Sequence, residues 1–172
     1  MKNIFNDSSN PLVVLEVANN HQGDLEHGLK IINEFGNISE NYSDDFTFAF
    51  KFQYRKLSTF IHKDSLDSDI KYVKRFLETK LEQDEWKALI KRVQELNFLT
   101  MCTPFDEESV DSVIQDNFQI LKIASASIDD WPLIEKIGKS SHNNIIASVG
   151  GASIEKIKRF YSYMNNKEKN IA

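Results

Sequence analysis

Polar and charged residues follow several short apolar runs of this chain, and their types suit the binding of an anion. The set comprises Glu16 with Asn20 and His21, Lys51 with Gln53, Thr103, Lys122 with Ser125, and Ser148 with Gly150. Lysines supply positive charge, while hydroxyl groups and the amides of a glycine turn supply directed hydrogen bonds. If these residues meet at one place in the fold, they predict a pocket for a phosphate or carboxylate group.

Each of these residues also has a purely structural interpretation. Glu16 lies in an apolar run and can be an acid that pairs with a lysine for stability. A histidine in a turn, such as His21, is more often hydrogen-bonded within the turn than a ligand or a base. Lys122 can extend from a strand end into water, and Ser125 or Ser148 can cap a following helix. The repetition of polar groups after every apolar run favours the functional interpretation.

The segment 46–54 alternates between aromatic and smaller or polar residues. One face carries Phe46, Phe48, Phe50, Phe52 and Tyr54, and the other carries Thr47, Ala49, Lys51 and Gln53. This period of two predicts a strand whose aromatic face is covered by helices. Its other face suits the inside of a parallel barrel, where the carboxyl end of a strand meets the substrate. An antiparallel strand with Lys51 and Gln53 in water explains the pattern equally well.

Strand and helix patterns alternate along the whole chain. Strands are predicted at 12–18, 46–54, 98–103, 119–124 and 144–149, and helices from Asp24 to Gly36, at 70–77, 86–97 and 106–115, after Asp130 and after Gly150-Gly151. The inward residues are predicted to be Leu25, Leu29, Ile32 and Phe35 in the first helix and Ile154, Ile157, Phe160 and Tyr161 in the last. Since no hairpin signal separates neighbouring strands, the pattern predicts a parallel α/β sheet.

The sheet is expected to be part of a barrel rather than a nucleotide-binding fold. The turn after the first strand contains neither G-x-G-x-x-G nor G-x-x-x-x-G-K. A (β/α)8 barrel needs ~250 residues, so the five strand–helix units of these 172 residues predict an incomplete parallel (β/α) TIM barrel in one domain. Residues 170–172 look like the beginning of a sixth strand.

Composition excludes several classes of protein. A net charge of −5 argues against general nucleic-acid binding, which requires a basic surface. No apolar stretch is long enough to cross a bilayer, and the first residues lack the apolar core of a signal peptide. The one cysteine, Cys102, lies in an apolar run and is expected to be a buried thiol. We therefore expect a cytoplasmic protein with no nucleic-acid or membrane partner.

Five segments resemble the sialic acid synthase family, whose members make N-acetylneuraminate and related nonulosonic acids. They are Glu16 to Asp24 (EVANNHQGD), Lys51 to Gln53 (KFQ), Thr103 to Asp106 (TPFD), Lys122 to Ser125 (KIAS) and Ile146 to Gly150 (IASVG). The segments follow the order and spacing of the family and together span nearly the whole chain.

The resemblance implies a TIM-barrel catalytic domain that condenses phosphoenolpyruvate with an N-acylated amino sugar such as N-acetylmannosamine, releasing phosphate. Family members usually add a small antifreeze-like domain that completes the active site of a swapped homodimer. We expect this chain to lack that domain and the second half of the barrel, and to be inactive alone. The alternatives are a synthase of legionaminic, pseudaminic or 3-deoxy sugar acids, a non-catalytic anion-binding fragment, or an inactive interaction module.

The resemblance also implies roles for individual residues. Phosphoenolpyruvate would be held by Lys51, Thr103, Lys122, Ser125 and Ser148. Gln53 would contact the acceptor sugar, and Glu16 would lie near the reacting centre, with Asn20 and His21 in the adjoining loop. Glu16, Lys51 and Lys122 are thus the expected catalytic residues.

The chain departs from the family in three respects. The family uses a divalent metal, manganese or magnesium, whose histidine ligands lie on later strands, and neither His62 nor His142 stands in a matching motif. Ser127 replaces an acid that is expected to steer the attacking water, for which Asp129 or Asp130 is a possible substitute. The segment after Gln53 does not clearly reproduce a sugar-binding asparagine of the family.

Overall fold

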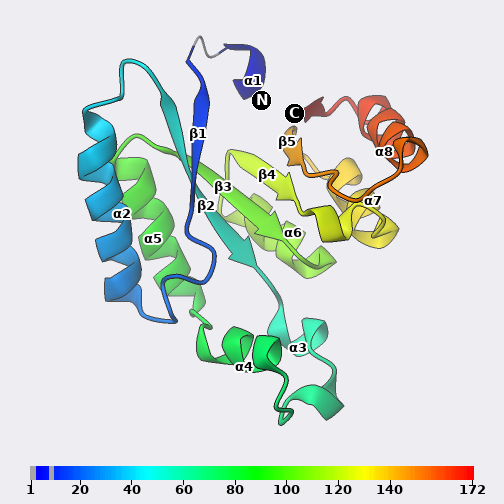
Figure 1. Ribbon diagram of the computed structural model, residues 1–172, viewed down its shortest axis with the longest axis horizontal. Coiled ribbons are helices and arrows are strands. Elements are labelled where there is room, and N and C mark those ends of the chain that lie inside the picture. The colour runs from blue at the N-terminus through cyan, green and yellow to red at the C-terminus, as the bar shows by residue number, and fades with distance from the viewer. Residues whose placement is uncertain (1–2, 8–9) are drawn as a thin grey trace.

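Six parallel strands form the centre of the protein, which we describe from a computed structural model covering residues 3–7 and 10–172, without the side chains of residues 6 and 7. The strands are β1 (Leu12–Glu16), β2 (Thr47–Tyr54), β3 (Leu99–Pro104), β4 (Ile120–Ile123), β5 (Asn144–Ala147) and β6 (Asn170–Ile171). They lie in the sheet in the order of the sequence, and every neighbouring pair is parallel (Figure 1). The predicted sixth strand is therefore confirmed.

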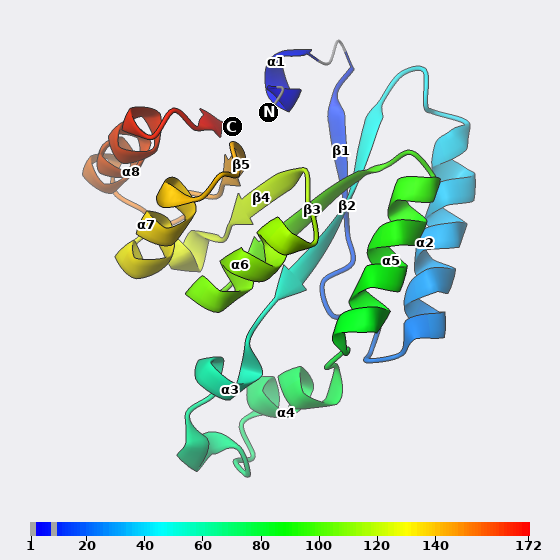
Figure 2. The same ribbon diagram turned by 180° about the vertical axis from the view of Figure 1, so that it is seen from behind.

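Helices connect the strands and cover one face of the sheet. They are α1 (Ile4–Asp7), α2 (Leu25–Glu40), α3 (Leu57–Phe60), α4 (Lys71–Glu78), α5 (Gln83–Glu95), α6 (Glu107–Gln115), α7 (Trp131–Lys139) and α8 (Ile154–Asn166), with 3-10 turns at Lys63–Ser65 and Ser125–Ser127. Helix α6 lies behind the sheet in Figure 1 and in front of it in Figure 2, and α2 and α5 lie side by side in both views. Within the described ranges, none of these helices has both the length and the apolar character needed to cross a membrane.

The strand order distinguishes a barrel from a doubly wound sheet. Crossover connections between parallel strands share one hand, so a sheet that always grows in the same direction carries its helices on one face. The other face then becomes the inside of a curling sheet, as in a (β/α) barrel. Parallel pairing of β2 with both β1 and β3 confirms the predicted fold class and excludes the antiparallel alternative.

Strand β2 separates an aromatic layer from a polar interior, as its alternation predicts. On the helix side, Phe50 and Phe52 are completely buried, and the Phe52 ring centroid lies 5.8 Å from that of Trp86 in α5. On the opposite side, Ala49 and Lys51 are also buried. Burial on both faces is expected of a parallel strand. The predicted burial of Cys102 is confirmed too, as it belongs to the same core as Phe52.

Two predictions about helix α2 differ in outcome. Asp24 is its N-cap, as predicted, and the carboxylate accepts a hydrogen bond from the His27 amide. The predicted end at Gly36 is wrong, because α2 continues to Glu40. Gly36 instead lies where α2 packs on α5, and a Cβ atom there would stand only 2.8 Å from Leu96 Cδ1. Gly36 thus allows the two helices to pack closely. From the sequence alone, a glycine with this role looks the same as a glycine that ends a helix.

The predicted apolar faces of the first and last helices are partly wrong. Phe35 is 46% exposed, Ile154 61% and Tyr161 56%. The buried residues of α8 are Phe160 and Met164, four positions apart. A helix on the outside of a sheet buries a narrow stripe at this spacing, so apolar residues beside the stripe stay in contact with solvent.

Residues 55–82 form an excursion between β2 and α5 that contains α3 and α4, and the β1–α2 loop packs against its end. Gly23 of that loop has φ +74°, and a Cβ atom there would lie 2.6 Å from the Glu78 carbonyl oxygen. The predicted short helix at 70–77 is confirmed as α4. Gly23 thus fixes the distance between the loop after β1 and the end of α4.

We predict that Gly23→Ala lowers the free energy of unfolding by about 3 kcal/mol, since a left-handed backbone and a backbone clash combine. Gly151→Ala is the matched control, because Gly151 has φ +80° but no atom within 4 Å of its would-be Cβ. It should cost only about 1 kcal/mol. Urea unfolding of both variants measures the difference. An equal decrease in the free energy of unfolding for the two variants would show that the contact with Glu78 does not affect stability.

Candidate active site

An ion pair joins the carboxyl ends of β1 and β2. Glu16 and Lys51 are aligned in the parallel register, and Lys51 Nζ donates to Glu16 Oε2. The other carboxylate oxygen accepts a hydrogen bond of 3.1 Å from the Ala18 amide. The Lys51 side chain is 9% exposed and that of Glu16 46%, so the ammonium group is covered while the carboxylate remains open to solvent.

A second lysine enters the same region from β4. Lys122 Nζ donates to Ser148 Oγ, just beyond β5, and to the Ile123 carbonyl oxygen at 2.8 Å. Burial lowers the pKa of Lys122, the positive charge of Lys51 lowers it further, and the negative charge of Glu16 partly compensates. The two pairs, Glu16 with Lys51 and Lys122 with Ser148, thus lie at the carboxyl ends of strands of one parallel sheet, where the sequence predicts the polar groups.

Between the two lysines, β3 contributes a hydroxyl group that has no partner. Thr103 is 2% exposed, and its Oγ1 atom is buried without a hydrogen bond. It is aligned with Gln53 of β2, on the face that also carries Lys51. Buried hydroxyl groups nearly always have a partner, so this one marks a place where a ligand atom or a water molecule is expected.

Turns after β4 and β5 border this cluster. Ser125 is exposed in the 3-10 turn Ser125–Ser127, and a Cβ atom on Gly150 would lie 3.9 Å from Ser125 Cβ. The cluster as a whole has two ammonium groups against one carboxylate. Its excess of positive charge and its hydroxyl groups suit an anion.

Asn20 and His21 lie in the β1–α2 loop that adjoins Glu16, as the resemblance implies. His21 is 1% exposed, its Nδ1 accepts a hydrogen bond of 3.1 Å from the Gly23 amide, and its ring meets Trp86 edge-on at 5.2 Å. Burial lowers the pKa of His21 to about 4, so the ring is neutral near pH 7. This geometry matches the structural alternative for His21. Asn20 is exposed in the β1–α2 loop.

Neither aspartate near Ser127 is available to replace the acid of the family. The Asp129 carboxylate pairs with Lys156 of α8, and the Asp130 carboxylate caps α7 by accepting from the Leu133 amide. Ser127 itself is buried. The position thus supplies a hydroxyl group where a carboxylate is expected.

The described residues also do not form a metal site. In the ranges 3–7 and 10–172, no three His, Cys, Asp or Glu side chains cluster in a way that could hold an ion. His62 is exposed and caps the turn Lys63–Ser65, whereas His142 is buried with its Nε2 3.2 Å from the Asn144 carbonyl oxygen. The donor set of a divalent metal is therefore not met by these side chains, and we assign no step to one.

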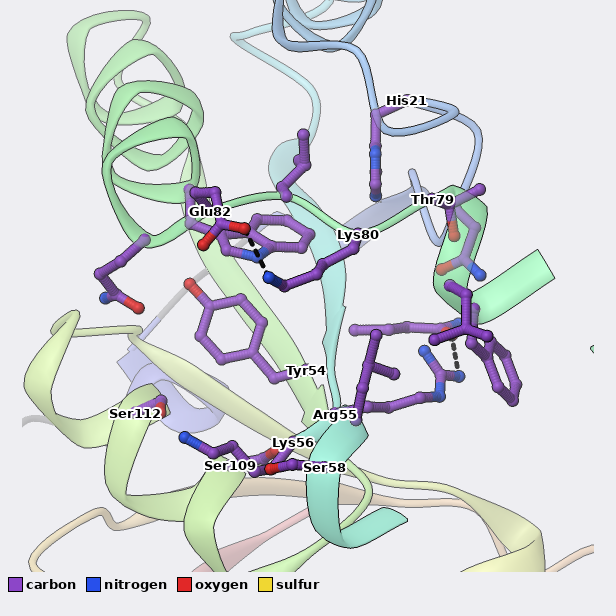
Figure 3. A pocket seen from close by; sticks show the side chains of 18 of the residues that line it. His21, Tyr54, Arg55, Lys56, Ser58, Thr79, Lys80, Glu82, Ser109 and Ser112 are labelled. Atoms are coloured by element: carbon purple, nitrogen blue, oxygen red, sulfur yellow. Dashed lines mark hydrogen bonds and ion pairs between the residues drawn. The ribbon is translucent and has the colours of Figure 1, made fainter. Parts of the chain in front are cut away.

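A cavity of about 700 Å³ adjoins the end of β2, and one of its lining residues, Arg55, was not predicted from the sequence. Figure 3 shows Arg55 extending into this region from the end of β2, opposite Tyr54 and Lys80. Arg55 Nη2 donates to Gln53 Oε1 at 2.7 Å. Continuing the alternation of Lys51 and Gln53 by one step places Arg55 on the same face, which is the signal that could have found it.

Comparison with known proteins identifies the relationship. The sequence profile of the NeuB family matches residues 47–172. The chain belongs to the NeuB family. NeuB relatives include the N,N'-diacetyllegionaminic acid synthase of Campylobacter jejuni, which is 30% identical over 86% of this chain, and the N-acetylneuraminate-9-phosphate synthase of Homo sapiens, which is 26% identical over 87% of it. The resemblance to sialic acid synthases is thus confirmed.

Solved structures agree with this NeuB assignment. A Chromobacterium violaceum protein described as spore coat polysaccharide biosynthesis protein E matches with a TM-score of 0.89 and 42% identity over 94% of this chain. An N-acetylneuraminic acid synthetase from Leptospira borgpetersenii matches with a TM-score of 0.74 and 25% identity. The chain covers 44% of the Campylobacter enzyme, 42% of the human one and 48% of the Chromobacterium chain. It therefore spans less than half the length of these NeuB relatives.

The buried, neutral state of His21 predicts an acid-sensitive stability. In the unfolded chain His21 binds a proton near pH 6.5, whereas in the folded chain it does so only near pH 4. Its contribution is complete above pH 6.5 and is lost as the pH falls towards 4, by about 3 kcal/mol. His21→Phe should reduce this loss, while His62→Gln, at an exposed site, should not. Thermal unfolding between pH 7 and 4 tests this, and parallel curves for His21→Phe and wild type would contradict it.

Proposed function

We propose that this chain forms the phosphoenolpyruvate-binding part of a nonulosonic acid synthase. The reaction joins the enol carbon of phosphoenolpyruvate to the aldehyde carbon of an N-acylated amino sugar, adds water at the neighbouring carbon and releases phosphate. The observation that carries the proposal is the pair of lysines at the carboxyl ends of β2 and β4, where Lys51 donates to the Glu16 carboxylate and Lys122 to the Ser148 hydroxyl group. Membership of the NeuB family supports it.

The charge and hydrogen-bonding groups fit this donor substrate. Phosphoenolpyruvate carries a carboxylate and a phosphate, and two lysines neutralise such a molecule where it is partly shielded from water. The buried Thr103 hydroxyl lacks a partner and would donate to one of its oxygens. Ser148 already accepts a hydrogen bond from Lys122 and can donate its own proton to the ligand, with Ser125 at the border of the site.

Glu16 holds Lys51 in place before the substrate binds. When the anion binds, Lys51 would donate a further N–H group to it. The exposed side of the Glu16 carboxylate would then face the reacting centre. We assign Gln53 to the acceptor sugar, because it lies on the same face as Lys51 and one step nearer the mouth. Asn20 would border the site from the β1–α2 loop, and His21 would support that loop rather than contact the substrate.

The proposed domain is part of a TIM barrel, and the remaining groups of the active site would come from outside these residues. These include metal ligands for manganese or magnesium and groups supplied by the partner in a homodimer. The relatives are named as synthases of different products, N,N'-diacetyllegionaminic acid in Campylobacter and N-acetylneuraminate 9-phosphate in humans. The acceptor is therefore proposed as a class, an N-acylated amino sugar, in a cytoplasmic enzyme.

A second candidate function is anion binding without turnover. Ser127 stands in place of the acid expected to steer water, and the carboxylates of Asp129 and Asp130 are engaged elsewhere. In this case phosphoenolpyruvate would bind but no phosphate would be released by the full-length protein with the sugar and Mn²⁺ present. A coupled phosphate-release assay separates the two functions.

We predict that Lys51→Met and Lys122→Met each weaken phosphoenolpyruvate binding by at least tenfold, because each removes a charge-assisted hydrogen bond worth about 1.5–3 kcal/mol. Isothermal titration calorimetry measures the dissociation constants. Lys136→Met is the control, since Lys136 pairs with Asp111 on the helix layer. If both variants bound as tightly as wild type, the proposed donor site would be wrong.

Thr103→Val should separate binding from stability. Valine has the shape of threonine, so the change removes only a buried hydroxyl group that has no partner. The free protein should be as stable as wild type or more stable by about 1 kcal/mol, whereas phosphoenolpyruvate should bind roughly tenfold more weakly. Thermal unfolding and calorimetry on the same variant provide the test. A loss of stability with unchanged affinity would indicate that Thr103 serves the fold alone.

A further inference from the structure

Three phenylalanines from separate segments enclose the Arg55 guanidinium group. Its central carbon lies 4.1 Å from the ring centroid of Phe105, 4.4 Å from that of Phe76 and 5.9 Å from that of Phe60. Phe60 ends α3, Phe76 lies in α4, and Phe105 follows β3. The rings of Phe60 and Phe76 also contact each other, at 5.8 Å. Arginine stacked between aromatic rings is held by cation–π attraction and loses much of its freedom.

The backbone on both sides of Arg55 is also fixed. The Phe105 amide donates to the Tyr54 carbonyl oxygen at 3.1 Å, and the Lys56 amide donates to Asp106 Oδ2 at 2.8 Å. Asp106 is itself held as the N-cap of α6. The ends of β2 and β3 are therefore joined directly around Arg55, so its position does not depend on the loops of the excursion.

Arg55 sets the orientation of the Gln53 amide. A guanidinium group only donates hydrogen bonds, so the atom of Gln53 that it contacts, at 2.7 Å, must be the oxygen (dashed line beside Arg55 in Figure 3). The amide nitrogen then points away from Arg55. Burial lowers the pKa of Arg55 to about 10, so the side chain keeps its charge, and this orientation, near pH 7.

We propose that Arg55 is a positioning residue that holds the Gln53 oxygen and so presents the NH₂ group of Gln53 as a hydrogen-bond donor at the mouth of the barrel. The NH₂ group that points away from Arg55 would then donate to an oxygen acceptor of the substrate, such as the acyl carbonyl or a hydroxyl oxygen of an amino sugar. This inference rests on the proposed function, because it takes Gln53 to face the acceptor.

The competing explanation is that the cluster of Arg55 with Phe60, Phe76 and Phe105 only anchors the excursion of residues 55–82 to the sheet. Both explanations predict lower stability when Arg55 is replaced. They differ in the behaviour of the Gln53 side chain, since only the positioning role requires that its NH₂ group respond to both Arg55 and the acceptor. A direct view of that group therefore decides between them.

Side-chain amide signals in ¹H–¹⁵N NMR spectra of the 19.9 kDa chain provide this view. We expect the Gln53 NH₂ signals of wild type to shift on addition of N-acetylmannosamine in the presence of phosphoenolpyruvate. In Arg55→Met the signals should move to the positions of a freely rotating glutamine, with N-acetylmannosamine bound about tenfold more weakly and phosphoenolpyruvate unchanged. Arg75→Met, which removes an exposed arginine of α4, should resemble wild type.

A second variant keeps the test valid if Arg55→Met does not fold. Gln53→Glu retains an oxygen towards Arg55 and strengthens that contact by its charge, but it removes the NH₂ donor. It should be at least as stable as wild type in thermal unfolding, and it should bind N-acetylmannosamine at least tenfold more weakly with little change for phosphoenolpyruvate. A Gln53→Glu variant that bound the sugar normally would overturn the inference.

The outcomes also separate this inference from the proposed function. Wild-type chain that binds phosphoenolpyruvate, but whose Gln53 signals ignore N-acetylmannosamine, overturns the role of Arg55 and leaves the donor site intact. Loss of phosphoenolpyruvate binding in Arg55→Met equal to the loss for the sugar would assign Arg55 to general stability. Wild-type chain that binds neither compound overturns both.

Discussion

The parallel pairing of β2 between β1 and β3 is the constraint on which the rest of the structure depends. Phe50 and Phe52 fit only the helix side, so the strand has one possible register. A slip of one residue would bring these rings into the interior and turn Lys51 towards the helices. The hydrophobic effect on one face thus holds a charged side chain on the other, and the position of Lys51 follows from aromatic packing rather than from its own contacts.

The polar cluster at the carboxyl ends of the strands has two lysines, Lys51 and Lys122, and one carboxylate, Glu16. Lys51 is paired with Glu16, whereas Lys122 donates hydrogen bonds to the neutral oxygens of Ser148 and Ile123. A partly buried ammonium group with neutral partners loses some of its hydration, and an incoming anion would offset that loss on binding. We therefore expect a bound anion to lower the free energy of this site.

The sequence predicted the sheet, its order and the convergence of polar groups, since these depend on local patterns and on the shared direction of parallel strands. The sequence did not predict the orientation of a side chain in a loop. His21 contacts Trp86, 65 positions later, and a contact between such distant positions leaves no local sequence pattern. The enclosure of Arg55 by Phe76 and Phe105 is similarly non-local. Phe35 shows the opposite error, because it follows the apolar period of its helix and yet is 46% exposed.

The close contact between Gly23 and the Glu78 carbonyl oxygen has a consequence for how relatives can diverge. It fixes the junction between α4 and α5, just as the bonds around Lys56 fix the start of the same excursion. Insertions and deletions are then admissible mainly in the stretch 62–70, most of whose residues are exposed. Changes in chain length there would alter the cavity beside Leu66, whereas the lining residues from the end of β2, such as Tyr54 and Arg55, would keep their positions.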